Sequence, residues 1–174
     1  MTPLQKVAMG LVIVIVDPDV RGFDAVPDVL GWVLVLAGLF DLRSALNAFG
    51  ALAALAVICT LVSAAEMVPA VPRLLDESGG WFLSLPQLVF SIILCSSIAA
   101  LVDPAGTGVG RRLARLRWGF VALIPAPALL YGGGLERQEV LVALVGVAAV
   151  AANVYLIYLL FKVSQLPAAV ATHP

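Results

Sequence analysis

Hydrophobic residues gather in about six blocks along this chain, and the charged residues lie almost entirely between the blocks. The blocks cover residues 3–16, 26–40, 44–68, 81–102, 116–131 and 140–163. A helix needs roughly 20 residues to cross the hydrocarbon core of a bilayer, and the third, fourth and sixth blocks reach that length. The fifth reaches it if its helix begins within 111–117, with arginine side chains extending to the interface. The pattern predicts an all-α fold, a polytopic integral membrane helical bundle of about six hydrophobic helices with the first two short.

The composition also predicts a chain embedded in lipid. Apolar residues make up 62% of the sequence and charged residues 12%, whereas a soluble domain carries about 25% charged residues. We expect residues 1–168 to form a single transmembrane domain, followed by a short C-terminal tail at 169–174. The net charge of -1 argues against a nucleic-acid partner, which needs a clustered basic face. The expected partners are the lipid bilayer and, as open alternatives, a second copy of the chain or another membrane protein.

The positions of Lys and Arg predict how the chain is threaded, because cytoplasmic loops carry an excess of these residues. With the N-terminus inside, seven basic residues fall in the cytoplasm and three fall outside. The seven are Lys6, Arg43, Arg111, Arg112, Arg115, Arg117 and Lys162. A preference for Arg, Ala, Val and Leu is typical of bacteria with GC-rich genomes. We therefore expect a multi-pass protein of the bacterial plasma membrane with both termini in the cytoplasm.

The first two blocks admit two arrangements. They either span the membrane as short helices joined by a loop at the outer interface, or form a re-entrant pair that enters from the cytoplasm. Four Asp residues in the loop at 17–28 would be costly at membrane depth, so we expect the loop at the interface. Both arrangements place Gly10, Gly31 and Gly38 on facing sides of the two helices. Because glycine lets helix backbones approach closely in lipid, these residues predict a tight hairpin.

Small residues and prolines predict further local features. The sixth helix, with Gly146, Ala149 and Asn153, is expected to form a similar packing face, and the third is rich in small residues, including Ser44, Ala48, Ala51 and Ala54. We expect Pro86 in the first turn of the fourth helix, where its missing N–H has no consequence. Prolines at 125 and 127 are expected to kink the fifth helix.

The loop at 17–28 is the densest polar feature of the sequence. Its charged residues are Asp17, Asp19, Arg21, Asp24 and Asp28. Its spacing resembles a calcium-binding EF-hand loop, in which positions 1, 3, 6 and 12 would be Asp17, Asp19, Gly22 and Asp28. However, Arg21 holds a position that needs an oxygen ligand, and Asp28 is shorter than the usual bidentate Glu. We therefore favour a structural role, with Arg21 neutralising part of the cluster and Asp28 at a helix start, and we expect no metal site.

The fourth helix carries a polar stripe, which consists of Ser84, Gln87, Ser91 and Cys95. Polar groups within a span usually face the interior of the bundle. The stripe either lines a permeation path or joins helices through hydrogen bonds, and its lack of charge favours the second interpretation. Asn153 in the sixth helix is a candidate partner, so the candidate intramembrane contacts are Gln87, Ser91 and Asn153.

Catalytic and cofactor-binding patterns are missing from the sequence. The one His residue is His173 in the tail, so no intramembrane His acts as a base or a metal ligand. None of the motifs HExxH, GxSxG and CxxC occurs. We expect no catalytic residues and no cofactor.

The N-terminal quarter of the chain contains a recognisable run. It consists of Leu4-Gln5-Lys6, Gly10, Gly22-Phe23-Asp24, Pro27-Asp28 and Gly31-Trp32. This run resembles uncharacterised small polytopic membrane proteins of Gram-positive bacteria, in which two short apolar helices flank a G-[FI]-D-x-h-P-D-h-h-G-[WY] turn (h, apolar). The resemblance implies membrane location and bacterial origin, and it implies no mechanism.

Together these features predict a non-enzymatic integral membrane protein that acts as a scaffold, assembly or accessory subunit. The alternative is a small oligomeric transporter or channel, which the polar stripe on the fourth helix supports.

Overall fold

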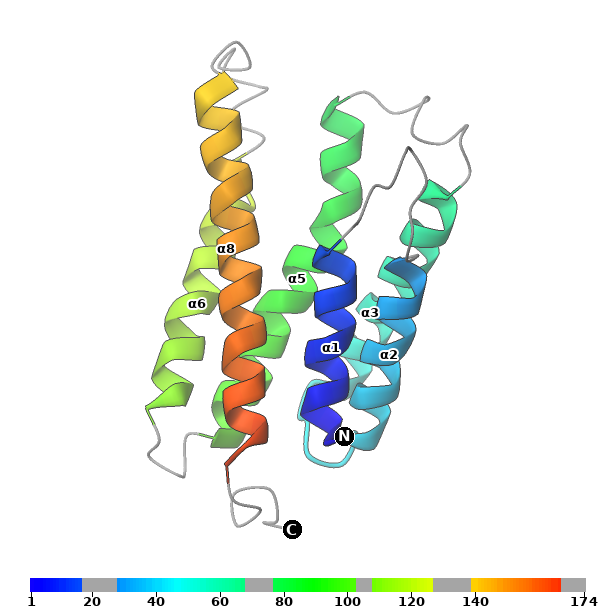
Figure 1. Cartoon of the computed structure of the whole chain (residues 1–174), viewed down its shortest axis with the longest axis vertical. Coiled ribbons are helices and arrows are strands. Elements are labelled where there is room, and N and C mark those ends of the chain that lie inside the picture. The colour runs from blue at the N-terminus through cyan, green and yellow to red at the C-terminus, as the bar shows by residue number, and fades with distance from the viewer. Residues whose placement is uncertain (17–27, 68–76, 103–107, 127–138, 167–174) are drawn as a thin grey trace.

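The computed structural model describes residues 1–16, 28–67, 77–102, 108–126 and 139–166. Within these residues the chain forms six helices and no strand, which confirms the all-α prediction. The helices are α1 (Pro3–Ile15), α2 (Asp28–Asp41), α3 (Phe49–Glu66), α5 (Glu77–Val102), α6 (Val109–Leu123) and α8 (Glu139–Ser164). They run alternately up and down, so that α1, α3 and α6 begin at the lower end of the molecule in Figure 1.

Three helices are long and apolar enough to cross a membrane. The stretches are Phe49–Glu66 in α3, Leu83–Val102 in α5 and Ala143–Ser164 in α8, which are the three blocks that reach spanning length in the sequence. In contrast, α1 and α2 have only 13 and 14 residues. Each is therefore about 20 Å long, whereas the hydrocarbon core is roughly 30 Å thick. Figure 1 shows both helices ending below the upper ends of α3, α5 and α8.

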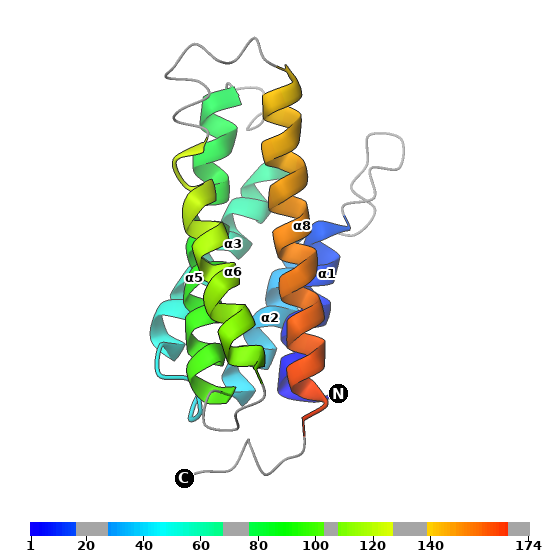
Figure 2. The same cartoon turned by 90° about the vertical axis from the view of Figure 1, so that its left-hand side faces the viewer.

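The six helices form a closed ring. Each helix packs against the next in chain order, and α8 closes the ring by packing against α1. Figure 2 shows α6 and α8 side by side, with the short pair α1 and α2 behind and beside them. The interior of the ring is filled by apolar side chains, of which Trp32, Phe90 and Phe120 are the largest fully buried ones. Trp32 and Phe90 meet edge to face, with ring centroids 5.3 Å apart and planes at 87°, a favoured aromatic geometry.

The start of α1 follows from its local sequence. Thr2 caps the helix: the Gln5 N–H donates to the Thr2 hydroxyl oxygen (3.3 Å), and the Thr2 N–H donates to Gln5 Oε1 (2.9 Å). Pro3 occupies the first helical position, where its fixed backbone angle suits a helix and its missing N–H is not needed. These two bonds satisfy the backbone N–H groups of Thr2 and Gln5, which have no partner within the helix.

The predicted tight hairpin of α1 and α2 is confirmed. A Cβ atom added to Gly10 would collide with the Gly31 carbonyl oxygen, and one added to Gly31 would lie 2.7 Å from the Gly10 carbonyl oxygen. One added to Gly38 would lie 2.7 Å from the Pro3 carbonyl oxygen. The two backbones therefore approach so closely that only glycine fits at these positions. At the lower end, Lys6 Nζ pairs with Asp41 Oδ2 at 2.6 Å and ties the same two helices together.

Other packing predictions are wrong in part: Asn153 on α8 is buried as expected, but several small residues of the predicted faces are not. A Cβ at Gly146 would meet nothing within 4 Å, so this part of α8 forms no close seam within the described residues. Ala51 and Ala54 are exposed, and α3 instead turns Leu52, Ala56 and Cys59 to the interior.

The two proline predictions also need correction. Pro86 lies inside α5, which begins at Glu77, nine residues before it. Because the helix continues upstream through a glycine pair, the first turn lies earlier than the apolar block indicated. Pro125 lies in a bend at 124–125 directly after α6, which ends at Leu123, and Ala126 is helical again, so the helix is interrupted at this proline. Pro127 lies outside the described residues.

Candidate functional site

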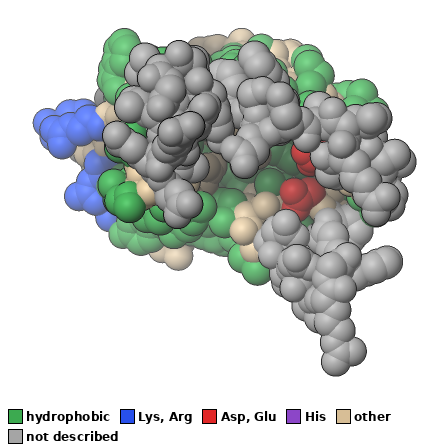
Figure 3. Space-filling model, turned by 90° about the horizontal axis from the view of Figure 1, so that it is seen from above, with side chains coloured by type: hydrophobic (Ala, Val, Ile, Leu, Met, Phe, Trp, Pro, Cys, Tyr) green, Lys and Arg blue, Asp and Glu red, His purple; other side chains and the backbone are tan. Residues whose placement is uncertain are grey.

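A pocket of about 180 Å³ lies between α2, α3 and α5. We call it the acidic pocket. Its described lining residues are Asp28, Trp32, Cys59, Val62, Ser63, Glu66, Leu83, Ser84 and Gln87. Figure 3 views the molecule from above and shows acidic side chains within a hollow of this upper face. Five of the nine side chains are polar or acidic, which distinguishes the pocket from the apolar interior beneath it.

Helix periodicity brings these residues to one place. On α2, Asp28 and Trp32 are one turn apart and so share a face. On α3, Cys59, Ser63 and Glu66 follow the spacing i, i+4, i+7, which places them in one stripe directed at the neighbouring helices. On α5, Ser84 and Gln87 are three residues apart. Each helix contributes one short polar stretch, and the pocket forms where the three stretches meet.

The electrostatic character of the pocket is negative. Asp28 stands in the first turn of α2, where the positive end of the helix dipole favours its charge. Its Oδ1 atom is buried, while Glu66 is exposed. Glu66 is the last residue of α3, where the negative end of the dipole disfavours a carboxylate. None of the described lining residues is Lys or Arg, so a cation in the pocket would offset an unfavourable accumulation of negative charge.

The floor of the pocket is closed by the aromatic pair. Trp32 lines the pocket and is 1% exposed, and Phe90 packs against it with no exposure. Below this level Ser91 and Cys95 are also fully buried, and the Ser91 hydroxyl donates to the Gln87 carbonyl oxygen at 3.0 Å. The polar stripe is therefore divided: Ser84 and Gln87 face the pocket, whereas Ser91 and Cys95 lie in the packed interior.

The structure separates the predicted site residues into three groups. Of the acidic loop, Asp17, Asp19, Arg21 and Asp24 lie outside the described residues. Asp28 is described, and it lines the acidic pocket together with Gln87, a residue that the sequence placed in a different candidate site. Asn153 is buried on α8, and its Nδ2 donates to the Ala149 carbonyl oxygen at 3.0 Å. Among the described residues, no hydrogen bond joins Asn153 to the polar stripe, because its amide is engaged within its own helix.

Sequence analysis overlooked the contribution of α3. Ser63 and Glu66 line the pocket, although neither belongs to a recognised motif. A signal was present, because Cys59, Ser63 and Glu66 recur at one-turn spacing on an otherwise apolar helix. Thr60, between them, donates its hydroxyl to the Ala56 carbonyl oxygen at 2.7 Å and so satisfies its polar group locally. In the described part of the chain, no group of three or more His, Cys, Asp or Glu side chains is placed to hold a metal ion.

Comparisons with known proteins add no relative to this picture. No family model, no curated protein and no solved structure matches the chain. The resemblance of the N-terminal run to small membrane proteins of Gram-positive bacteria therefore stays a prediction.

Proposed function

We propose that this chain is a non-enzymatic integral membrane protein, an accessory or scaffold subunit that binds a small cationic group in the acidic pocket. The observation that carries the proposal is the meeting of Asp28 and Glu66 with three neutral polar residues in a space of about 180 Å³. Ionisable residues within membrane segments are costly and usually serve a function. Carboxylate, hydroxyl and amide oxygens are also the groups that coordinate hard cations and ammonium groups.

The contents of the pocket favour binding over catalysis. Cys59, Ser63 and Ser84 are the candidate nucleophiles at the site, and a buried thiol or a hydroxyl needs activation, commonly by an adjacent His, to become reactive. The one His of the chain is His173, in a segment distant from this site in sequence. A pocket that closes on the Trp32–Phe90 pair suits a ligand that enters and leaves from the upper end.

The same geometry bears on how the first hairpin enters the membrane. Asp28 lies beside Ser63 on α3 and Gln87 on α5, and both of these residues fall within spanning stretches. Helices about 20 Å long cannot cross a hydrocarbon core of roughly 30 Å. We therefore favour the re-entrant arrangement over the interfacial loop expected from the sequence. The neutral polar side chains that line the pocket reduce the cost of placing Asp28 at depth.

The direction of the helices suits the proposed topology in the bacterial plasma membrane. Lys6, Arg111 and Lys162 lie within two turns of lower helix ends, and the alternation of helices places these ends on one side. We propose that this side is cytoplasmic, with both termini inside. A single cysteine replacing Gly79 should then label from outside in intact cells, and one replacing Gly108 only after permeabilisation. Labelling of the Gly108 variant in intact cells would reverse the assignment.

Cation binding can be tested by thermal unfolding of the detergent-solubilised protein. A ligand that binds the folded state raises its stability by RT ln(1 + [L]/Kd). We expect Ca²⁺, Na⁺ or methylammonium, added singly, to raise Tm, and we expect Asp28→Asn and Glu66→Gln to abolish the response. Asp41→Asn is the matched control, because it removes a carboxylate at the opposite end of α2. A response that is unchanged in both pocket variants, or lost equally in the control, would contradict the proposal.

A transporter is the second candidate, and the position of Pro86 favours it. Pro86 interrupts the hydrogen bonding of α5 between the pocket residues Ser84 and Gln87, because proline has no N–H to donate. Interrupted helices are typical of substrate sites in transporters. In proteoliposomes, a flux of the stabilising cation that Gln87→Leu abolishes, with Tm retained, would favour transport. Binding without flux would favour the accessory role.

A further inference from the structure

The basic residues of α6 form the most strongly charged surface in the described part of the chain. Arg111, Arg112 and Arg115 are exposed near the lower end of the helix, while Leu113 and Phe120 face the core. Arg111 and Arg115 are one turn apart and so lie on the same face, where two like charges disfavour the helix. Within the described residues, the one ion pair is that of Lys6 with Asp41. The exposed arginines therefore have no carboxylate partner in this part of the structure.

A fourth arginine on this helix is engaged differently. The Arg117 guanidinium donates to the Ser96 hydroxyl on α5 at 3.4 Å and lies 5.1 Å from the ring centroid of Trp118. Trp118 is 63% exposed, which is typical of an aromatic residue at a membrane interface. Arg117 thus joins α6 to α5, and Arg111 and Arg115 are left facing outward below it.

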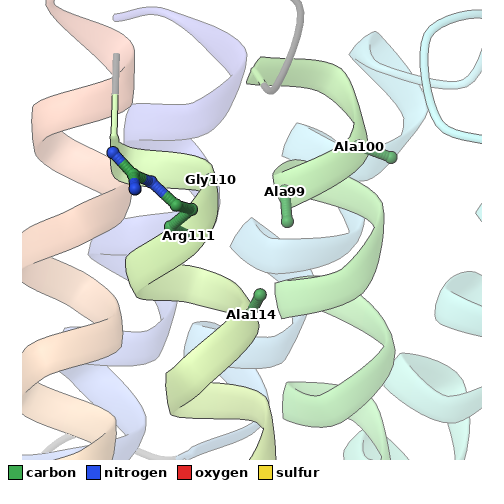
Figure 4. Close-up of a pocket in the computed structure, with 5 residues that line it drawn as sticks. All are labelled: Ala99, Ala100, Gly110, Arg111 and Ala114. Atoms are coloured by element: carbon green, nitrogen blue, oxygen red, sulfur yellow. The ribbon is translucent and has the colours of Figure 1, made fainter. Parts of the chain in front are cut away.

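A second pocket, of about 170 Å³, lies beside these arginines between α5 and α6. We call it the arginine slot. Its described lining residues are Ala99, Ala100, Gly110, Arg111 and Ala114. Figure 4 shows Ala99 and Ala114 pointing into the space between the two helices, while the Arg111 guanidinium points away from the alanines, to the side of α6 that faces away from α5. The slot therefore combines apolar walls of small side chains with Arg111, whose charged end lies outside the slot at its edge.

We infer that the arginine slot binds one anionic phospholipid, with the headgroup phosphate against Arg111 and Arg115 and part of the lipid's apolar body between α5 and α6. Guanidinium groups bind phosphate through paired, charge-assisted hydrogen bonds. Basic pockets between membrane helices are known to hold anionic headgroups. A free phosphate would contact only the guanidinium groups of Arg111 and Arg115. A lipid would also fill the apolar slot, so the presence of both features favours a lipid over a free phosphate.

The test is lipid binding to the purified full chain in detergent, measured by native mass spectrometry. The probes are phosphatidylglycerol and phosphatidylcholine with identical acyl chains. We expect one phosphatidylglycerol to bind in preference to phosphatidylcholine. Replacing both arginines (Arg111→Gln with Arg115→Gln) should weaken this binding roughly thirtyfold, from the typical contribution of a basic residue near a charged headgroup. Equal binding of the two lipids would overturn the inference.

Two further variants separate a defined slot from diffuse charge. Arg43→Gln removes an exposed positive charge from the α2–α3 connection and should leave binding unchanged; an equal loss in this control would overturn the inference. Ala114→Leu keeps the charge and fills the slot, so it should weaken phosphatidylglycerol binding, whereas Ala54→Leu at an exposed position of α3 should not. If the Ala114→Leu variant binds phosphatidylglycerol as tightly as the wild type, the lipid does not occupy the slot. Displacement of the lipid by inorganic phosphate at equal concentration would indicate a free anion site and overturn the lipid assignment.

Discussion

Two pairs of neighbouring helices in this ring use small residues in opposite ways. In α1 and α2, the glycines stand where one backbone faces the other, and an added Cβ at Gly31 would lie 2.7 Å from a carbonyl oxygen. In α5 and α6, the small residues Ala99, Ala100, Gly110 and Ala114 line the interface, yet a slot of about 170 Å³ remains between the helices. The first pair is closed by its small residues, and the second is left open.

The difference shows that small residues permit a close approach without producing one. Facing glycines close the α1–α2 interface along its length, because Gly10 and Gly31 meet each other and Gly38 meets Pro3. The α5–α6 pair is held apart at the slot and joined farther along by Arg117 and Ser96. A side-chain hydrogen bond joins helices at a longer distance than backbone contact does, and the space that remains can take a ligand.

The largest expected effect is that of over-packing the closed pair. Gly31→Leu should lower the free energy of unfolding by about 3 kcal/mol, because the new side chain would have to displace the α1 backbone. Chemical or thermal unfolding in detergent measures this change. Gly146→Leu is the matched control, since a Cβ there meets nothing within 4 Å, and it should leave stability unchanged or slightly raised. Equal losses in both variants would show that the close approach has no special importance.

An intermediate effect is expected for the open pair. Ser96→Ala removes the acceptor of the Arg117 hydrogen bond and should lower the free energy of unfolding by about 1 kcal/mol. Ser164→Ala is a suitable control, because the Ser164 hydroxyl donates only to the Phe161 carbonyl oxygen of its own helix. A loss as large as that of Gly31→Leu would mean that α5 and α6 depend on one side-chain contact as strongly as α1 and α2 depend on their glycines.

The smallest expected effect concerns the ion pair at the lower end of the closed hairpin. The side chains of Lys6 and Asp41 are 33% and 43% exposed, so solvent weakens their attraction. Lys6→Gln should lower the free energy of unfolding by about 0.5 kcal/mol. The difference from the wild type should shrink as salt is added, because exposed charges are screened. A loss greater than that of Ser96→Ala would show that the ion pair, and not the glycine seam, closes the hairpin.

The helices and one interface could be predicted from the sequence. Long apolar blocks form helices in lipid because every backbone polar group must find a partner within its own segment, and α3, α5 and α8 follow from this rule. The α1–α2 hairpin was also predictable, because Gly10, Gly31 and Gly38 fall on facing sides at helical spacing. Gly146 was also predicted to lie on a packing face, and that prediction was wrong. Helical spacing in the sequence does not distinguish a glycine that faces outward from one that faces a neighbouring helix.

The acidic pocket depended on the tertiary structure. Asp28 appeared in the sequence as the end of a loop and Gln87 as part of an uncharged stripe, while Glu66 belonged to none of the predicted sites. Each helix supplies only one or two polar side chains to the site, and periodicity within a helix carries no information about which faces of different helices meet. That choice is made by packing around Trp32 and Phe90, where three helices come together. The sequence by itself determined that the chain is helical and suited to lipid, because those properties are local; the tertiary structure decided where charge gathers, because that depends on contacts between segments far apart in the chain.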